Sequence, residues 1–190
     1  MIIIVSIFSH TFIKTKLGQH IVCDIFNQGL TFNLKELHSD TLCLKGYINH
    51  HSVKDFEQTI QRHPNVKVLQ LDTIPGSLAP QQGILLGKAV RQLGLSTYIP
   101  KHGVIIGCGI DIFLGGEKRM AEESCTIIIT TKSNQQSLII GDAEKFYSER
   151  HNYYYLNMGI DNNFIEYIND LRSGSRTILS PQLIKELILK

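Results

Sequence analysis

Tryptophan is absent from this 190-residue sequence, and aromatic residues make up only 8% of it. An excess of charge of one sign is also missing, because 19 lysines and arginines face 17 aspartates and glutamates. No strong field therefore draws the protein to nucleic acid or to an anionic lipid surface, and we expect no nucleic-acid partner. At 43% hydrophobic the chain can bury a core, which excludes wholesale disorder. The length predicts one domain that spans residues 1–190.

Cysteines are few and widely spaced. The four are Cys23, Cys43, Cys108 and Cys125. They form no C-x-x-C pair and no spacing typical of a zinc site. They are also too dilute for a disulfide scaffold, so buried free thiols are the expectation. We therefore expect neither a metal nor a cofactor.

The sequence lacks an apolar run long enough to cross a membrane. Its longest apolar opening is Met1–Phe8 (MIIIVSIF), far short of the roughly 20 residues that a membrane helix needs. No basic residue precedes this run and no small-residue cleavage site follows it, so its Ile and Val content favours a buried strand. A truncated export signal is the alternative. We expect no stable membrane insertion and leave the compartment open, with a cytoplasmic location favoured over export.

The central part of the chain alternates strand and helix patterns. Ser52 with Asp55 predicts a capping box at the start of one helix. Pro80 suits the first turn of a second helix and Gly94 its C-terminal cap. Strands are predicted at Leu42–Ile48, Val66–Leu71, Thr97–Pro100, Val104–Ile106 and Thr126–Thr130, and a glycine-rich buried helix at Gly107–Gly116. This succession predicts a right-handed parallel α/β layer structure.

The tail has a different character, because helical patterns follow one another without strands. Helices are predicted at Asp142–Asn157 and Asn162–Leu171, and a third is expected to start at Ser180-Pro181. We expect them to cap the α/β layer or to contact another subunit. The run Tyr153–Tyr155 could stack on a partner, with part of it facing the core.

Two loops could carry chemistry. The first is Asp72–Leu78 (DTIPGSL), which follows a hydrophobic strand and precedes a helix, where ligands of open α/β proteins bind. Its Gly76 could bring a bare backbone N–H close to a ligand oxygen. The second is Gly107-Cys108-Gly109 at the expected start of a buried helix, which offers unpaired N–H donors. An ordinary turn and tight helix packing are the alternatives, but two donors from separate loops have the geometry of an oxyanion hole.

Between about Leu42 and Thr131 the chain resembles the Clp-protease/crotonase superfamily, above all the small Clp-protease-like serine peptidases of bacteria. The segments that carry the resemblance are Leu44–Ile48 (LKGYI), Leu71–Ser77 (LDTIPGS) with Gly76 on the second glycine of the oxyanion segment, and Phe113–Arg119 (FLGGEKR) at the end of the nucleophile segment. The tail from Met158 to Leu187 is similar to the C-terminal portion of such proteins. The resemblance implies an α/β fold, a crotonase-like (Clp-protease-like) ββα spiral with a core at about 41–131 and a C-terminal helical extension at 142–190. It also implies a homo-oligomer.

The departures from this pattern concern the reacting groups. Counting back from Phe113 and Gly116 places the family's nucleophilic serine at Gly107, and counting forward from Arg119 places its histidine base at Thr130. Glycine has no nucleophile, and threonine does not accept a proton near neutral pH. The favoured hypothesis is a non-catalytic homologue that keeps the oxyanion donors, the N–H groups of Gly76 and Cys108. Its role would be assembly, or binding of a peptide or acyl ligand.

Two enzymatic alternatives stay open, beside an unrelated α/β protein. In the first, Cys108 acts as the nucleophile of a thiol hydrolase or peptidase, with His102 or His50 as its base. In the second, Gly107–Ala121 (GCGIDIFLGGEKRMA) resembles the glycine-rich helix of crotonases, and Asp111 falls where hydratases of that family place an acidic residue. The carboxyl of a hydratase or isomerase should then lie in a pocket near the Gly76 and Cys108 amides. A salt bridge on the far side of the helix would argue against it.

Overall fold

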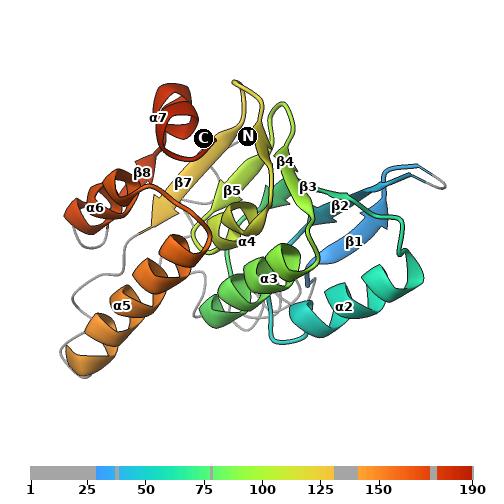
Figure 1. Ribbon diagram of the computed structural model, residues 1–190, viewed down its shortest axis with the longest axis horizontal. Helices are drawn as coiled ribbons and strands as arrows, with labels where there is room; N and C mark the ends of the chain where they lie inside the picture. Colours follow the sequence, from blue (N-terminus) through green and yellow to red (C-terminus); the bar gives the residue numbers. More distant parts are fainter. Residues whose placement is uncertain (1–28, 37–38, 78, 131–140, 172–174, 190) are drawn as a thin grey trace, which may run out of the picture.

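An eight-stranded sheet forms the centre of the protein in the computed structural model, which describes residues 29–36, 39–77, 79–130, 141–171 and 175–189 (Figure 1). The strands are β1 (Thr31–Leu34), β2 (Thr41–Lys45), β3 (Val68–Ile74), β4 (Ser96–Ile99), β5 (Val104–Ile106), β6 (Arg119–Ala121), β7 (Thr126–Thr130) and β8 (Arg176–Ile178). The strand predicted at Met1–Phe8 lies outside the described residues. The prediction at Thr126–Thr130 is confirmed to the residue.

The strands at the centre of the sheet are parallel, as the alternating pattern predicts. The main path runs β1-β2-β3-β5-β7-β8, in which β2, β3, β5 and β7 are parallel neighbours and the two edge strands are antiparallel. The sheet branches at β3, because residues 68–70 of this strand pair with β4 whereas Thr73 and Ile74 pair with β5. The β6 strand then pairs with β4. The chain therefore winds through two strand ladders rather than one flat sheet.

Six helices are described beside the strands. They are α2 (Ser52–Arg62), α3 (Pro80–Gln92), α4 (Gly109–Gly115), α5 (Gly141–Asn157), α6 (Asn162–Asp170) and α7 (Pro181–Leu187). The three helices predicted in the tail are confirmed. In Figure 1, α2 and α3 lie along one side of the sheet, α4 lies between α3 and the strands, and α5 extends away from the body. No described helix is long and apolar enough to span a membrane.

Several predicted element boundaries are wrong by a few residues, among them the end of the strand predicted at Leu42–Ile48, which ends at Lys45. Two of them have local reasons. Ser52 begins α2 rather than capping it, and its Oγ accepts a hydrogen bond from the N–H of Asn49, while the Asn49 side chain accepts one from the N–H of His51. The helix therefore starts without a side-chain cap at its N-cap residue His51, and these two hydrogen bonds close the turn before it. Strand β3 continues through Asp72 to Ile74, because Thr73 still pairs with both neighbouring strands.

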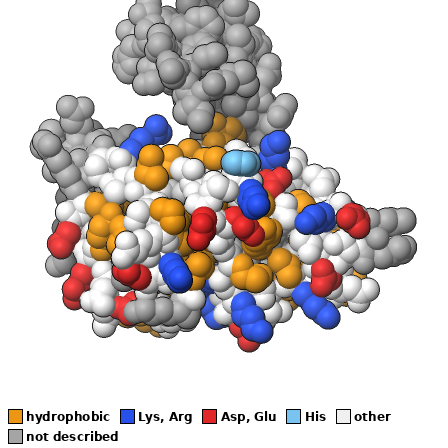
Figure 2. Space-filling view, turned by 90° about the horizontal axis from the view of Figure 1, so that it is seen from above, with side chains coloured by type: hydrophobic (Ala, Val, Ile, Leu, Met, Phe, Trp, Pro, Cys, Tyr) orange, Lys and Arg blue, Asp and Glu red, His pale blue; other side chains and the backbone are white. Residues whose placement is uncertain are grey.

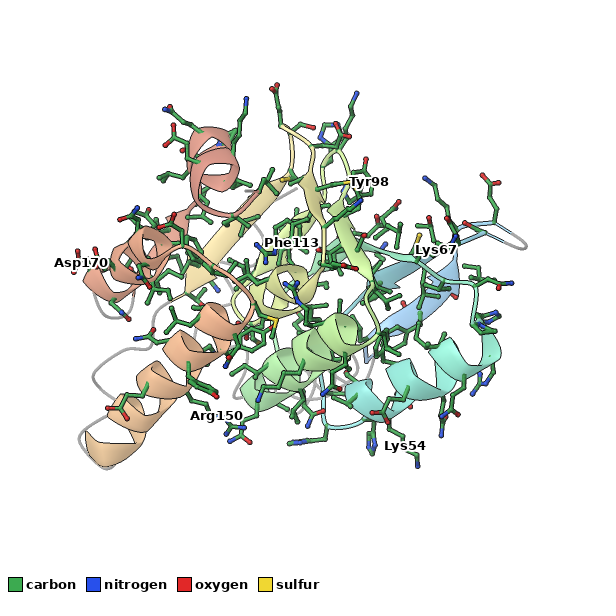
Figure 3. All side chains as sticks on the ribbon, in the orientation of Figure 1. Lys54, Lys67, Tyr98, Phe113, Arg150 and Asp170 are labelled. Atoms are coloured by element: carbon green, nitrogen blue, oxygen red, sulfur yellow. The ribbon has the colours of Figure 1, made fainter. Side chains whose placement is uncertain are left out.

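The core lies between the sheet and the helices. The largest fully buried side chains from strands are Leu42, Leu44, Leu69, Leu71 and Ile74, and from α2 to α4 they include Phe56, Ile84, Leu86 and Phe113. The α4 helix lies in the interior, and its Phe113 is labelled near the centre of Figure 3. Its seven residues are all buried, including the polar Asp111. On the face shown in Figure 2, acidic and basic side chains alternate with apolar ones, so this face carries no field of a single sign.

Two arginines connect the ends of the C-terminal helices to α4. The Arg119 guanidinium donates to the carbonyl of Leu114 (3.2 Å), to that of Ile188 (3.0 Å) and to that of Met158. Arg91 also donates to the Met158 carbonyl, at 3.1 Å. These carbonyls lie at the ends of α4, α7 and α5, where unpaired oxygens and the helix dipoles favour a cation.

Candidate functional site

The first candidate loop follows β3 and is fastened to the chain beyond β2. The N–H of Ile48 donates to the Gly76 carbonyl at 3.2 Å. The Ser77 hydroxyl donates to the Ile48 carbonyl at 3.0 Å and accepts from the N–H of Ala79 at 2.8 Å. Gly76 has φ +139°, a conformation that favours glycine, and a Cβ built on it would meet no atom within 4 Å. Space beside Gly76 is therefore open.

The second loop joins β5 to α4. Gly107 has φ +57°, and its N–H donates to the Ile128 carbonyl of β7 at 2.9 Å. A Cβ at Gly107 would lie 2.9 Å from Oγ1 of Thr130, which ends β7. The fold thus brings Gly107 and Thr130, where the family resemblance expects the nucleophile and the base, side by side. Neither residue supplies a nucleophile or a base there.

The two loops meet at Cys108. The Ser77 side chain acts on the Cys108 thiol and lowers its pKa. Within the described residues, the backbone hydrogen bonds of the loops use the carbonyls of Gly76 and Cys108 as acceptors. No backbone carbonyl in this part of the chain accepts from the N–H of Gly76 or of Cys108. We call the pair of N–H groups the amide cradle.

The Cys108 thiol is in its neutral form at physiological pH. Burial raises its pKa to about 11, and the neighbouring Asp111 carboxylate raises it further than Ser77 lowers it. Neither of the two predicted bases acts on this thiol: His102 lies in the exposed turn before β5 with φ +62°, and His50 is exposed before α2. The Cys108 thiol thus lies beside the amide cradle, and neither His102 nor His50 acts on it.

Asp111 is 1% exposed and lies one helical turn after Cys108. Its Oδ1 accepts from the Tyr155 hydroxyl at 3.2 Å, and its Oδ2 lies 3.6 Å from Nε2 of His151. Burial raises the pKa of the Asp111 carboxyl, while His151 and Tyr155 act to lower it. The carboxylate that the crotonase alternative singles out is thus paired with a histidine of α5, and no described hydrogen bond connects its side chain to Gly76.

Sequence reasoning missed the α5 residues of this cluster. Tyr154 and Tyr155 are buried, and only Tyr153 of the tyrosine run is well exposed, at 68%. The run therefore faces the core more than a partner. The signal in the sequence is the spacing of His151, Tyr154 and Tyr155, which puts all three on one side of a helix, opposite a helix whose one charged residue is Asp111.

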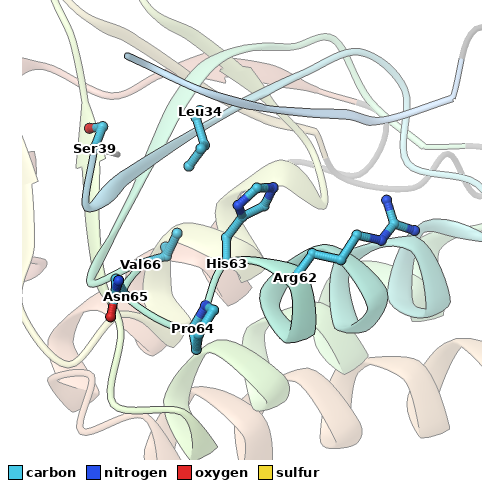
Figure 4. A pocket seen from close by; sticks show the side chains of 7 residues that line it. All are labelled: Leu34, Ser39, Arg62, His63, Pro64, Asn65 and Val66. Atoms are coloured by element: carbon cyan, nitrogen blue, oxygen red, sulfur yellow. The ribbon is translucent and has the colours of Figure 1, made fainter. Parts of the chain in front are cut away.

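Other places in the described residues offer less for a site. No group of three or more His, Cys, Asp or Glu in this part of the chain is arranged to hold a metal. A pocket of about 270 Å³ lies at the end of α2, lined by Leu34, Ser39 and residues 62–66. Figure 4 shows its His63 ring turned toward Leu34, while the Arg62 side chain points away along α2. None of its residues belongs to the two loops.

Comparison with known proteins finds similarity in structure only. No family model matches the chain. No curated protein matches its sequence. A variant of ClpP1 from Listeria monocytogenes superposes with a TM-score of 0.59 at 16% identity, covering 90% of this chain and 91% of that one. The ClpP protease catalytic domain from Plasmodium falciparum gives 0.54 at 16% identity over 75% and 78% of the two chains.

An enoyl-CoA hydratase from Shewanella pealeana gives a TM-score of 0.50 at 10% identity, over 87% of this chain and 69% of that one. Identities this low show the fold alone. They confirm the α/β spiral that the resemblance implies, with helices after its core. The chain has the fold of the Clp-protease/crotonase superfamily.

Proposed function

We propose that this protein is a Clp-protease-like homologue without peptidase chemistry, which assembles with copies of itself and binds a peptide or acyl carbonyl oxygen at the amide cradle. One observation carries the proposal. Gly107 and Thr130 occupy adjacent positions where the family resemblance expects the nucleophile and the base. Since a glycine and a threonine stand there, attack on a carbonyl and proton removal have no group to perform them.

The arrangement that remains suits binding. Space beside Gly76 is open, and Ser77 fastens this loop to Ile48. N–H donors placed beside a carbonyl oxygen stabilise the partial negative charge that it carries. The cradle would therefore recognise an amide or thioester carbonyl without cleaving it.

Two measurements test the proposal, one for chemistry and one for binding. With a fluorophosphonate probe we expect no labelled serine in the native protein, and a labelled Ser77 or any other serine would overturn the non-catalytic assignment.

Titration with a short acylated peptide should shift the amide NMR signals of Gly76 and Cys108. Gly76→Ala keeps the N–H but fills the open space beside it and strains the positive φ, so it should weaken this binding about tenfold. Gly159→Ala is the matched control, because Gly159 also has a positive φ and open space around it. Equal effects of both variants would contradict the cradle.

The thiol alternative makes a separate prediction. Because burial raises the pKa of Cys108 to about 11, a very small fraction is thiolate near pH 8. We expect iodoacetamide to alkylate Cys108 about a hundredfold more slowly in the folded protein than in the urea-denatured chain, a difference of about two pKa units. The rate should rise with pH until the thiol titrates. Peptide mass spectrometry measures it, and rapid labelling of Cys108 at neutral pH would favour the thiol hydrolase.

A hydratase or isomerase is a second candidate, and one observation favours it. Asp111 Oδ2 is buried without a hydrogen bond, and a carboxyl whose pKa is raised suits acid–base catalysis. Its pairing with His151 on α5 favours a structural role instead. Hydration of a short enoyl thioester that is lost in Asp111→Asn would support the enzyme.

A further inference from the structure

One turn of α5 converges on a single buried carboxylate of α4. The His151 ring lies 3.6 Å from Asp111 Oδ2, and the Tyr155 hydroxyl donates to Oδ1. The Tyr154 hydroxyl donates to the Asp111 backbone carbonyl at 2.6 Å. Residues 151, 154 and 155 lie on one side of a helix, so all three contacts depend on the same placement of α5.

Glycines of α3 make room for this cluster. A Cβ at Gly83 would come within 3.0 Å of Asp111 Oδ2 and of the Cys108 Cβ. A Cβ at Gly87 would come closer than 3.0 Å to the Tyr154 hydroxyl and to the Asp111 carbonyl. The carboxylate is therefore enclosed by helix backbone on the α3 side, where water and charged groups are kept away from it.

The charged and titratable groups around Asp111 come from each neighbouring element. From α5 come His151, Tyr154 and Tyr155, from the start of α4 comes the Cys108 thiol, and Arg91 of α3 and Arg119 of β6 act on Tyr154. Both arginines donate to the carbonyls of Leu114 and Met158. Among the described residues, His151 is the basic side chain that pairs with the Asp111 carboxylate.

Between Glu149 and Asn157, α5 contacts the body mainly through the side chains of one turn. Of its side chains from Glu149 to Asn157, only Tyr154 and Tyr155 are buried, whereas Tyr153 and Leu156 are 68% and 53% exposed. Tyr154 and Tyr155 pack in the core, and the hydroxyls of both also bind Asp111, so this one turn forms much of the attachment of residues 149–157.

We propose that Asp111 and His151 form a pH-dependent latch that holds α5 against α4, closed in mild acid and weakened as the pH rises through the titration of the histidine. This inference does not depend on the proposed binding function. When His151 is protonated, it neutralises the enclosed carboxylate. When it is neutral, the carboxylate is left buried without a cation, which is costly unless Asp111 takes up a proton or α5 moves away.

Loss of a proton from Asp111 and loss of a proton from His151 both weaken the latch. Burial raises the pKa of Asp111 above its value in water, so the docked form binds a proton more tightly than the undocked form. The stabilisation of the docked form by this proton is complete below the ordinary pKa of an aspartate. It is lost as the pH rises through the raised pKa of Asp111. Loss of the proton from His151 also removes the positive charge that faces the Asp111 carboxylate.

Hydrogen exchange of the full-length protein tests the latch. After correction for intrinsic exchange, protection of the amides at 150–158 should fall about tenfold between about pH 5.5 and pH 8. Asp111→Asn and His151→Gln should each flatten this dependence, and the exposed His102→Gln should leave it unchanged.

A native protein whose protection at 150–158 does not change with pH would overturn the latch. So would an unchanged pH dependence in either latch variant. If Asp111→Asn does not fold, His151→Gln decides, because the His151 side chain is 26% exposed and its loss leaves the core intact.

Discussion

Replacing Arg119 by alanine is expected to lower the free energy of unfolding by about 3–5 kcal/mol, measured by urea denaturation. Its guanidinium donates to the carbonyls of Leu114, Met158 and Ile188, at the ends of three different helices. A hydrogen bond from a charged donor contributes about 1.5–3 kcal/mol, and removal of the donor leaves carbonyls without a partner. The sum is not additive, because Arg91 also donates to the carbonyls of Leu114 and Met158.

Matched variants separate this role from a general effect of charge. Arg62→Ala removes an exposed arginine at the end of α2 and should cost less than about 0.5 kcal/mol. Arg119→Lys keeps the charge but presents one point donor in place of a planar fork, so we expect it to restore only part of the loss. A stability of Arg119→Ala within about 1 kcal/mol of the native protein would show that the three carbonyls find other partners.

Gly87→Ala should destabilise the protein by about 3 kcal/mol, opposite in sign to the usual effect of this change. In a helix interior, alanine is ordinarily more stable than glycine by about 1 kcal/mol. Here a Cβ would lie closer than 3.0 Å to the Asp111 carbonyl and the Tyr154 hydroxyl. The carbonyl belongs to the backbone of α4 and cannot turn aside, so α3 and α4 must separate.

A second substitution probes the same contact from the other helix. A Cβ at Gly115 would come closer than 3.0 Å to the backbone of Gly87, so Gly115→Ala should cost about as much. Gly159→Ala is the control for backbone strain alone, because that glycine has φ +69° with open space around it, and about 1 kcal/mol is expected. A stabilised Gly87→Ala in thermal denaturation would mean that the α3–α4 packing is looser than the structure shows.

The predicted elements that depend on local pattern agree best with the structure. The strand at Thr126–Thr130 is an uninterrupted β-branched run, and its ends agree to the residue. Gly94 ends α3 as expected: its φ is +65° and its N–H donates to the Arg91 carbonyl. The strands β1, β6 and β8 were not predicted, because short strands of mixed polarity owe their pairing to distant partners.

For the candidate site, too, the features that residue identity decides were visible in the sequence, and the contact between distant segments was not. Glycines at positions 76 and 107 stand out in the sequence, and both have the positive φ that a glycine-specific turn requires. The family resemblance places Gly107 and Thr130 at equivalent catalytic positions, and the structure brings them together through the pairing of β5 and β7. His151 escaped notice because its partner Asp111 is 40 residues away, in a helix of another pattern.

The sequence by itself determined the class of fold and the order of most strands and helices in its core, and it predicted the loss of the family's nucleophile at Gly107. These features depend on residue identity and on spacing within one element, which a chain carries before it folds. Only the tertiary structure decided that β3 divides its pairing between two ladders and that α5 brings a histidine and two tyrosines to Asp111. A buried carboxylate is stabilised by the polar groups that pack around it. Which groups these are depends on contacts between segments far apart in the chain.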